Sequence, residues 1–318
     1  MSKPALLVCV MLLSLGCAHK RPYAPKAAAP SGVLSTFQRQ VSNAVDAGEG
    51  DLALAALRRR LAAEPGNLQV RLALIRRYRE AGLPELALDY ARIGTERFPD
   101  SADMQVEMAR ALRALGLRAE AAEALERFFR RNPQLSPDVP AWLGILRDEL
   151  GQWQQGEAAH RAALALAPAR DDLFNNLGYN LLRQGRRQEA RQMLERALAL
   201  NPGSKTARNN LGLALAAEPA PALEQFQKVA DPATAHNNLA CTLIEQGRYA
   251  EARKELEIAL GYNRNHPAAL ANLSLLSELD GQAAAVGPGG RPPGRWARFW
   301  SAAWRILAGV DKQPSPRP

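Results

Sequence analysis

Asparagine is the residue whose recurrence in this sequence offers the clearest binding chemistry. It occurs at regular intervals through the second half of the chain, as the pairs Asn175–Asn176, Asn209–Asn210 and Asn237–Asn238 and then as Asn272. Each carboxamide offers two hydrogen-bond donors and an acceptor, so a row of them can bind an extended peptide backbone without selecting its sequence. Asparagine is a mediocre helix former, so its repeated use inside helices requires a reason. Either the amides form a ladder that binds a peptide, or they hydrogen-bond neighbouring helices to each other.

The other reactive side chains do not assemble into a catalytic or metal-binding pattern. The four histidines are too scattered for close metal-ligand spacing, and three cysteines are too few for a four-cysteine zinc site. Packing or a polar helix face is enough to explain His160 and His236, and Cys241 is expected to act as a small buried hydrophobe. The sequence contains no Walker loop, no nucleophile–base pair and no paired carboxylates. We therefore expect a non-enzymatic protein without a metal or cofactor.

The composition favours helices, and the charge lies at the two ends of the chain. Hydrophobic residues make up 47% and aromatic residues only 6% of the 318 residues, and Ala, Leu, Arg and Glu dominate. The net charge is +9, but residues 1–39 hold five basic and no acidic residues, and residues 291–318 hold six basic and one acidic residue. A nucleic-acid-binding protein would carry its basic surface on the folded body. Basic ends suit an anionic membrane surface better, so we expect no nucleic-acid partner.

The first sixteen residues have the pattern of a secretory signal. Lys3 precedes an uncharged, Leu-rich run over residues 5–16, which is too short to span a bilayer, since a span takes about 20 helical residues. The run ends at Leu-Ser-Leu-Gly-Cys17, which resembles the lipobox of bacterial lipoproteins, although Ser14 stands where Leu is usual. The resemblance implies cleavage after residue 16, lipidation of Cys17 and, because Ala18 follows, sorting to the outer membrane. The alternative is an ordinary signal peptide with an incidental cysteine.

Proline, glycine and small residues then recur with a common period. Prolines 34 or 35 residues apart are Pro65, Pro99, Pro133, Pro168 and Pro202, and seventeen residues before each stands Gly48, Gly82, Gly116, Gly151 or Gly185. A small residue lies between them at Ala53, Ala87, Ala121, Gly156 and Ala190. Glycine can end a first helix in the left-handed conformation, and proline cannot continue a second one. We expect helical hairpins that cross closely at the small residue and stack into a solenoid.

This pattern resembles the tetratricopeptide repeat. The clearest unit, 171–204, contains Leu177–Gly178, Ala190 and Pro202. The resemblance covers residues 34–281 in about seven units, of which 205–232 is degenerate because Glu218–Pro221 replaces the turn between its helices, and 267–281 is a terminal cap helix. The expected fold class is all-α, a tetratricopeptide helix-hairpin solenoid wound as a right-handed superhelix; the alternative is a related helical-hairpin array. The other units run over 34–67, 68–101, 102–135, 137–170 and 233–266.

The resemblance also implies which residues line the concave groove. Positions 2, 5, 6, 9 and 13 of each unit are expected to face inward. Asn176, Asn210, Asn238 and Asn272 hold position 6, as in the asparagine ladders of peptide-binding tetratricopeptide superhelices, whereas the earlier units have Ala73, Glu107 and Trp142 there. The lysine/asparagine clamp that grips a C-terminal carboxylate in chaperone-binding members is missing. Arginine clusters such as Arg76–Arg77 and Arg186–Arg187 are expected to be solvated helix faces.

Beyond the array, one segment is expected to contact a membrane or a partner, and two others are expected to be flexible connections. Residues 17–33 are rich in Pro and Ala and are expected to be a flexible tether, and residues 282–294 a Gly/Pro linker. Residues 295–310 then predict an amphipathic helix, too short to span a bilayer, before a disordered tail over 311–318. This helix could lie in the membrane interface, dock into a partner groove, or fold back onto the array. Its apolar stripe comprises Trp296, Phe299, Trp300, Trp304 and Leu307.

A lipidated cysteine, a tether and a repeat array resemble the TadD-type lipoproteins of tight-adherence (Flp) pilus assembly. The most similar run is 162–186, and a more distant likeness is to the pilotins that chaperone secretin subunits. The resemblance implies an outer-membrane lipoprotein on the periplasmic face of the bacterial envelope, which binds protein or peptide partners in its groove during assembly of a pilus or secretion apparatus. The alternative is a peptide-binding adaptor for other envelope enzymes, such as those of cell-wall synthesis.

Overall fold

The computed structural model describes residues 51–281, which form fourteen α-helices and no strand. They divide at Pro202–Gly203 into two compact units, here called the N-terminal unit (51–202) and the C-terminal unit (203–281). The expectation of an all-α helical-hairpin solenoid is confirmed for this part of the chain. Between residues 51 and 281, no helix is both long enough and apolar enough to cross a bilayer.

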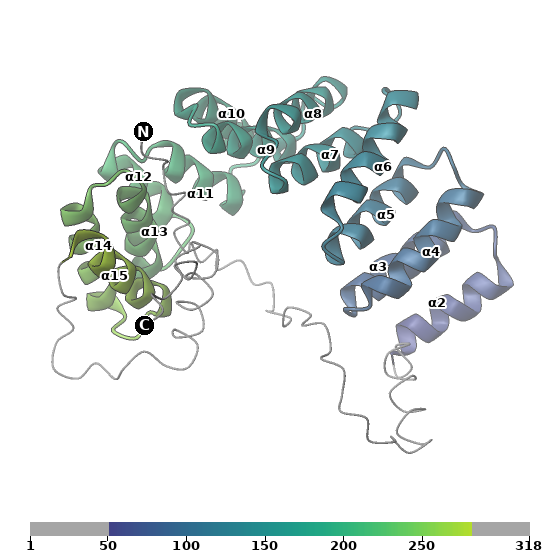
Figure 1. Cartoon of the computed structure of the whole chain (residues 1–318), viewed down its shortest axis with the longest axis horizontal. Coiled ribbons are helices and arrows are strands. Elements are labelled where there is room, and N and C mark those ends of the chain that lie inside the picture. The colour runs from purple at the N-terminus through teal and green to yellow at the C-terminus, as the bar shows by residue number, and fades with distance from the viewer. Residues whose placement is uncertain (1–50, 282–318) are drawn as a thin grey trace, which may run out of the picture. The chain divides into compact units, whose positions relative to one another are not determined.

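The N-terminal unit is a row of antiparallel helical hairpins (Figure 1). Each helix packs against the next along the chain, and α3, α5, α7 and α9 also contact one another in sequence order. These four are called the inner helices. The helices of the unit are α2 (Leu52–Ala63), α3 (Leu68–Glu80), α4 (Pro84–Arg97), α5 (Ala102–Ala114), α6 (Arg118–Arg131), α7 (Asp138–Glu149), α8 (Trp153–Leu166), α9 (Asp171–Arg183) and α10 (Arg187–Leu200).

The periodic glycines and prolines set the helix ends, as predicted. Gly82 follows the last residues of α3 with φ +77°, a left-handed conformation that a side chain would strain. The second helix of this hairpin, α4, ends at Arg97, two residues before Pro99. The same arrangement recurs at Gly116, Gly151 and Gly185, which also have positive φ, and before Pro65, Pro133, Pro168 and Pro202.

Small residues let the helices of a hairpin approach closely, as expected from the spacing. Ala87, Ala121 and Ala190 are fully buried, and a Cβ at Gly156 would overlap the Asp148 side chain. Ala53 is exposed in α2, but the helix it was expected to pack against lies before Gly48, outside the described residues, so the prediction for Ala53 stays a prediction. Larger side chains fill the space between hairpins, among them Tyr78, Leu112, Leu125 and Phe128.

The C-terminal unit contains two hairpins and a last helix. Its first hairpin is short because α11 has 10 and α12 has 9 residues. The expectation that Glu218–Pro221 replaces the turn is wrong. Pro219 and Pro221 lie in the first turn of α12, where a missing N–H costs no helical hydrogen bond. The helices are α11 (Lys205–Ala214), α12 (Pro219–Gln227), α13 (Pro232–Glu245), α14 (Tyr249–Tyr262) and α15 (Pro267–Asp280).

Candidate functional site

The inner helices of the N-terminal unit line a groove of about 250 Å³, here called the α3–α9 groove. Apart from Arg170, which ends its repeat, these residues hold positions 2, 5, 6 and 9 of successive repeats, as the prediction places them. Position 13, which was also expected to face inward, contributes no residue to the groove. Position 6 supplies Glu107, Trp142 and Asn176 in turn. The remaining lining residues are Arg76, Asp103, Val106, Arg110, Asp138, Ala141, Ile145, Arg170 and Asp172.

Three arginines surround one buried carboxylate in this groove. Glu107 is 1% exposed, and its carboxylate accepts hydrogen bonds from Arg76 Nε at 2.8 Å, Arg110 Nη1 at 2.8 Å and Arg79 Nη2 at 3.4 Å. Arg76 and Arg79 come from α3, whereas Glu107 and Arg110 come from α5. We call Arg76, Arg79 and Arg110 the arginine cluster. A buried carboxylate requires such partners, because an unpaired buried charge is strongly unfavourable.

Trp142 lies beside the arginine cluster and is half-buried. The guanidinium carbon of Arg110 lies 4.5 Å from the centroid of its ring, which is cation–π geometry. Val106, Ala141 and Ile145 add apolar surface next to the indole. The middle of the groove therefore offers an aromatic and aliphatic surface next to the arginine cluster.

Carboxylates line the groove at the first turn of the inner helices. Asp103, Asp138 and Asp172 occupy the second position of their repeats, and Arg170 bridges the last two: its Nη1 donates to Asp138 at 2.6 Å and its Nη2 to Asp172 at 2.6 Å. The hydrogen bond to Asp172, with that to Asp138, raises the pKa of Arg170 above its ordinary value. The groove thus carries separate acidic and basic rows.

The predicted asparagine ladder falls in both units. In the N-terminal unit Asn175 and Asn176 are half-buried on α9, and Asn175 Nδ2 donates to Asn176 Oδ1 at 3.4 Å. Asn176 also lines the α3–α9 groove. It is therefore the one ladder residue that lies in this groove, and its role in binding a peptide stays a prediction.

In the C-terminal unit the ladder asparagines are buried on α11, α13 and α15, here called the inner helices of that unit, and hydrogen bonds join them between successive helices. Asn238 Nδ2 on α13 donates to Asn209 Oδ1 on α11 at 3.3 Å. Asn272 Nδ2 on α15 donates to Asn237 Oδ1 at 2.9 Å and lies 3.1 Å from Cys241 Sγ. This is the contact required by the second interpretation, in which amides join neighbouring helices. Asn210 is 7% exposed on α11. Peptide binding by these amides stays a prediction.

A second polar chain in the C-terminal unit joins the starts of α13 and α15. The N–H of Ala269 donates to His266 Nδ1 at 3.1 Å, so the imidazole caps α15. His266 Nε2 lies 3.1 Å from Thr234 Oγ1, and that hydroxyl donates to Asp231 Oδ2 at 2.6 Å. Burial lowers the pKa of His266, and the charge of Asp231 opposes this. The hydrogen bond from Thr234 holds the pKa of Asp231 below its usual value.

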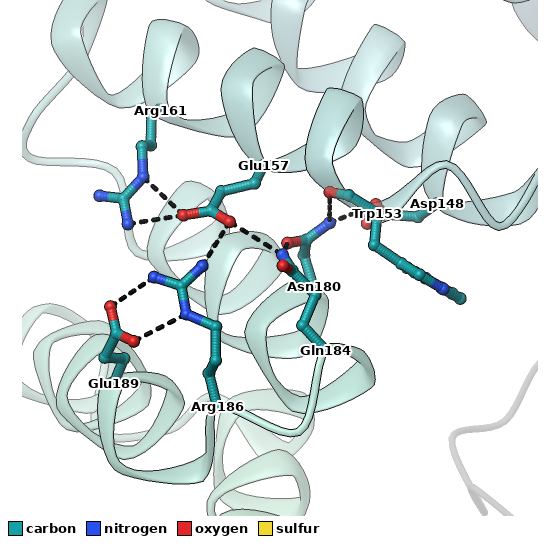
Figure 2. Close-up of polar contacts among 8 residues, drawn as sticks. All are labelled: Asp148, Trp153, Glu157, Arg161, Asn180, Gln184, Arg186 and Glu189. Atoms are coloured by element: carbon teal, nitrogen blue, oxygen red, sulfur yellow. Dashed lines mark hydrogen bonds and ion pairs between the residues drawn. The ribbon is translucent and has the colours of Figure 1, made fainter.

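A polar network of residues that do not line the groove holds α7, α8, α9 and α10 together (Figure 2). Asn180 Nδ2 donates to Asp148 Oδ1 at 2.5 Å and to the Trp153 carbonyl at 2.9 Å. Gln184 Nε2 donates to Asn180 Oδ1 at 2.7 Å and to Glu157 Oε2 at 2.9 Å. These contacts join three consecutive helices, so they fix the inner helices α7 and α9 relative to each other.

Glu157 is the charged centre of this network. It accepts hydrogen bonds from Arg161, four residues along α8, and from Arg186 at 2.6 Å, which also forms a two-point contact with Glu189. Burial alone would raise the pKa of Glu157, but the hydrogen bonds from Gln184, Arg161 and Arg186 bring it below its ordinary value. The network is therefore built for an ionised carboxylate.

His160 belongs to the same buried region. Its Nε2 lies 3.0 Å from Asp148 Oδ2, and its ring occupies the space left by Gly144, where a Cβ would lie 2.5 Å from the ring. The packing interpretation of His160 fits this position. Among residues 51–281, no group of three His, Cys, Asp or Glu side chains could hold a metal ion.

The structure corrects the interpretation of the arginine clusters. Arg76 and Arg186 are not simply solvated helix faces, because each binds a carboxylate of the neighbouring repeat, and Arg77 donates to Asp51 Oδ2 at 2.9 Å. The partners lie about one repeat away in sequence, so only the period could have indicated them. Cys17 and the stripe Trp296–Leu307 lie outside the described residues.

Comparison with known proteins identifies the repeats. The tetratricopeptide repeat family model matches residues 175–236 and 237–285. The peroxisomal targeting signal receptor of Eremothecium gossypii is 37% identical over 81 residues, which cover 26% of this chain and 14% of the receptor. This chain therefore matches only a small part of that relative.

Two solved structures share the fold. A chain of the APC/C hetero-tetramer Cut9-Hcn1 is 17% identical, with TM-score 0.56, over 74% of this chain and 48% of the other. A tetratricopeptide repeat protein from Parabacteroides merdae is 15% identical, with TM-score 0.52, over 75% of this chain and 96% of the other. Over residues 51–281 the protein is an all-α helical solenoid, and the tetratricopeptide repeat model matches its residues 175–285. Such solenoids are typically non-enzymatic scaffolds with extended surfaces that bind other proteins.

Proposed function

We propose that this protein binds an extended segment of a partner protein in the α3–α9 groove. The observation that carries the proposal is the groove itself. Equivalent positions of three consecutive repeats supply Glu107, Trp142 and Asn176, so charged, aromatic and amide groups follow one another along it. A segment crossing the inner helices would pass over Glu107, which is buried beneath its arginines, and then meet Trp142 and Asn176.

The similarity to a targeting signal receptor supports this proposal at the level of protein recognition. A receptor for a targeting signal recognises part of another polypeptide, and the matched segment shares 37% of its residues with this chain. The network of Figure 2 adds a physical argument, because it fixes α7 and α9, and a rigid groove loses less entropy when it binds.

We further propose that the protein acts in the bacterial envelope, as an outer-membrane lipoprotein anchored through Cys17 and serving the assembly of a pilus or secretion apparatus. The support is the sequence resemblance at residues 13–17 and 162–186. Each buried methylene of an acyl chain contributes about 0.8 kcal/mol, so several chains would hold the protein on the membrane. Labelling with a fatty-acid analogue should mark the wild type and not Cys17→Ser, and equal labelling of both would overturn the lipid anchor.

Site-specific photo-crosslinking in cells tests the binding groove. A photoreactive phenylalanine at Trp142, in the groove, should crosslink to a short stretch of a partner that mass spectrometry can map. The matched control is the same residue at Ile93, which is 53% exposed on α4 and does not line the groove. A pilus or secretion component captured only from Trp142 supports both proposals. Identical products from the two positions would contradict the groove as the binding site.

A further inference from the structure

We propose that the α3–α9 groove selects an acidic partner segment, whose aspartate or glutamate side chains bind the arginine cluster. This inference rests on the proposed function, because it names the chemistry of the segment that the groove binds. It concerns the arginine cluster, of which the sequence interpretation had assigned Arg76 to a solvated helix face.

The cluster has more positive charge than its own carboxylate can neutralise. Three guanidiniums converge on Glu107 alone, which leaves a local excess of two positive charges. Each guanidinium has five N–H donors, so the cluster offers about fifteen donors to a carboxylate with about four acceptor sites. A second carboxylate, from a ligand, would accept short charge-assisted hydrogen bonds from the unused donors and neutralise part of the excess charge.

Arg76 and Arg110 line the groove and are partly exposed, whereas Glu107, which also lines it, is almost completely buried. The side chain of Glu107 is 1% exposed, but those of Arg76, Arg110 and Arg79 are 45%, 30% and 28% exposed. Glu107 therefore acts from below the surface: it holds the guanidiniums in place and leaves their outer edges open to a ligand. Preorganised donors of this kind lose little entropy when they bind.

The acidic row of the groove gives the bound segment an orientation. Asp103 and Arg110 lie two helical turns apart on α5, about 10 Å along the helix axis. Asp138 and Asp172 share their row with Arg170, which neutralises one of the two charges. Ligand carboxylates are therefore attracted to the arginine side of the groove and repelled from the side of the aspartates.

The groove fits the interior of a chain better than its end. The arginine cluster joins α3 and α5, and the groove continues past it to Trp142 on α7 and Asn176 on α9. A segment with a carboxylate on the cluster can therefore lay its next residues over the apolar floor at Trp142. We expect acidic residues followed by an apolar side chain, with the backbone in reach of the Asn176 amide.

Peptide selection on the full-length chain tests this inference. The probe is a library of short random peptides displayed inside a phage coat protein, with a second library that ends in a free carboxylate. Peptides enriched by the wild type are then synthesised with their Asp and Glu residues kept, or replaced by Asn and Gln. We expect the acidic version to bind about tenfold more tightly, and added salt to reduce the difference.

Three variants separate charge from structure. Arg76→Gln should remove most of the preference for the acidic peptide, whereas Glu107→Gln should increase it, because the arginines lose their internal competitor. Arg127→Gln makes the same charge change on α6, where the side chain is 66% exposed and outside the groove, and should leave the preference unchanged. Because a merely structural role would make both groove variants bind more weakly, a weaker Glu107→Gln overturns the inference.

The outcomes distinguish this inference from the proposed function. Enriched internal peptides that need their carboxylates support both. Enriched peptides without acidic residues, or peptides that bind only through a free C-terminal carboxylate, overturn the acidic-segment inference and leave the groove as a binding site. If neither library yields a peptide that depends on Trp142, the proposed function fails as well.

Discussion

The inner helices of the two units carry different chemistry at equivalent repeat positions. In the N-terminal unit position 6 is charged, aromatic or amide, as Glu107, Trp142 and Asn176, and position 9 includes Arg76 and Arg110. In the C-terminal unit the same positions are uncharged: Asn210, Asn238 and Asn272 at position 6, and Leu213, Cys241 and Leu275 at position 9. In both units glycine, proline and alanine determine the geometry of the hairpins. The residue types at positions 6 and 9 can therefore differ between the units without changing the fold.

The contacts that join successive repeats differ in the same way. Ionised groups do this in the N-terminal unit, where Glu157 binds Arg186 and Arg113 contacts Glu149. Neutral groups do most of this in the C-terminal unit, where amides pair and His266 meets Thr234. The ion pair there, Arg253–Asp280, joins α14 to α15 and is largely buried. Salt screens partly exposed ion pairs more than buried neutral hydrogen bonds. The N-terminal unit is therefore expected to depend more on ionic strength, and the C-terminal unit on the protonation of one histidine.

Among the substitutions that test this difference between the units, Gly156→Ala should cause the largest loss of stability. The new Cβ would overlap Asp148 Oδ1 and lie 2.9 Å from Asn180 Nδ2, so it disturbs both helix packing and the network of Figure 2. We expect a loss of about 3 kcal/mol in the free energy of opening α7–α9, measured by hydrogen exchange. The control is Gly261→Ala in α14, where nothing lies within 4 Å of the new Cβ.

The two substitutions should have opposite signs. Alanine is the better helix former by about 1 kcal/mol, so Gly261→Ala should stabilise its helix slightly. If Gly156→Ala is also neutral, the close approach of α8 to the Asp148–Asn180 contact is not a source of stability, and the charged network does not distinguish the N-terminal unit.

Acid should weaken the C-terminal unit through His266. Because burial lowers the pKa of this histidine in the fold, the folded state resists protonation. Its contribution is complete above the ordinary value of 6.5 and is lost as the pH falls below it. Protonated Nδ1 cannot accept from Ala269, so we expect a loss of about 1 kcal/mol in protection of the α15 amides.

Hydrogen exchange of the Ala269 amide, corrected for its intrinsic pH dependence, measures this loss. His266→Asn keeps an N-cap acceptor without a titrating ring, so its protection should stay level across the same range. The Asp231 carboxylate does not titrate there, because its pKa is lowered. A variant with the same pH dependence as the wild type would show that another group is responsible.

The fold could be predicted from the sequence because its determinants repeat. Glycine and proline end helices by local backbone rules, and five copies of the pattern make those rules visible. The arginine cluster could not be found in the same way, because Arg76 and Glu107 meet only when two repeats stack in one register. The Asp148–His160–Asn180 contacts were missed for a similar reason: each residue is a single polar side chain in a different helix, with no short motif.

The asparagines give the smallest effect on stability and the sharpest test of what the ladder does. Asn238 is 2% exposed and its amide donates to Asn209, so Asn238→Ala should cost about 1 kcal/mol in the C-terminal unit. Asn176 is half-buried, and its hydrogen bond is with Asn175 on the same helix, so Asn176→Ala should change stability by less than about 0.5 kcal/mol.

Binding of a selected peptide is then measured for each variant. If the ladder contacts ligand in the α3–α9 groove, Asn176→Ala weakens binding while its stability is unchanged, and Asn238→Ala shows the reverse. Intact binding in Asn176→Ala would mean that Asn176 contributes neither to stability nor to peptide binding. The recurrence of asparagine would then be explained by the hydrogen bonds between helices of the C-terminal unit.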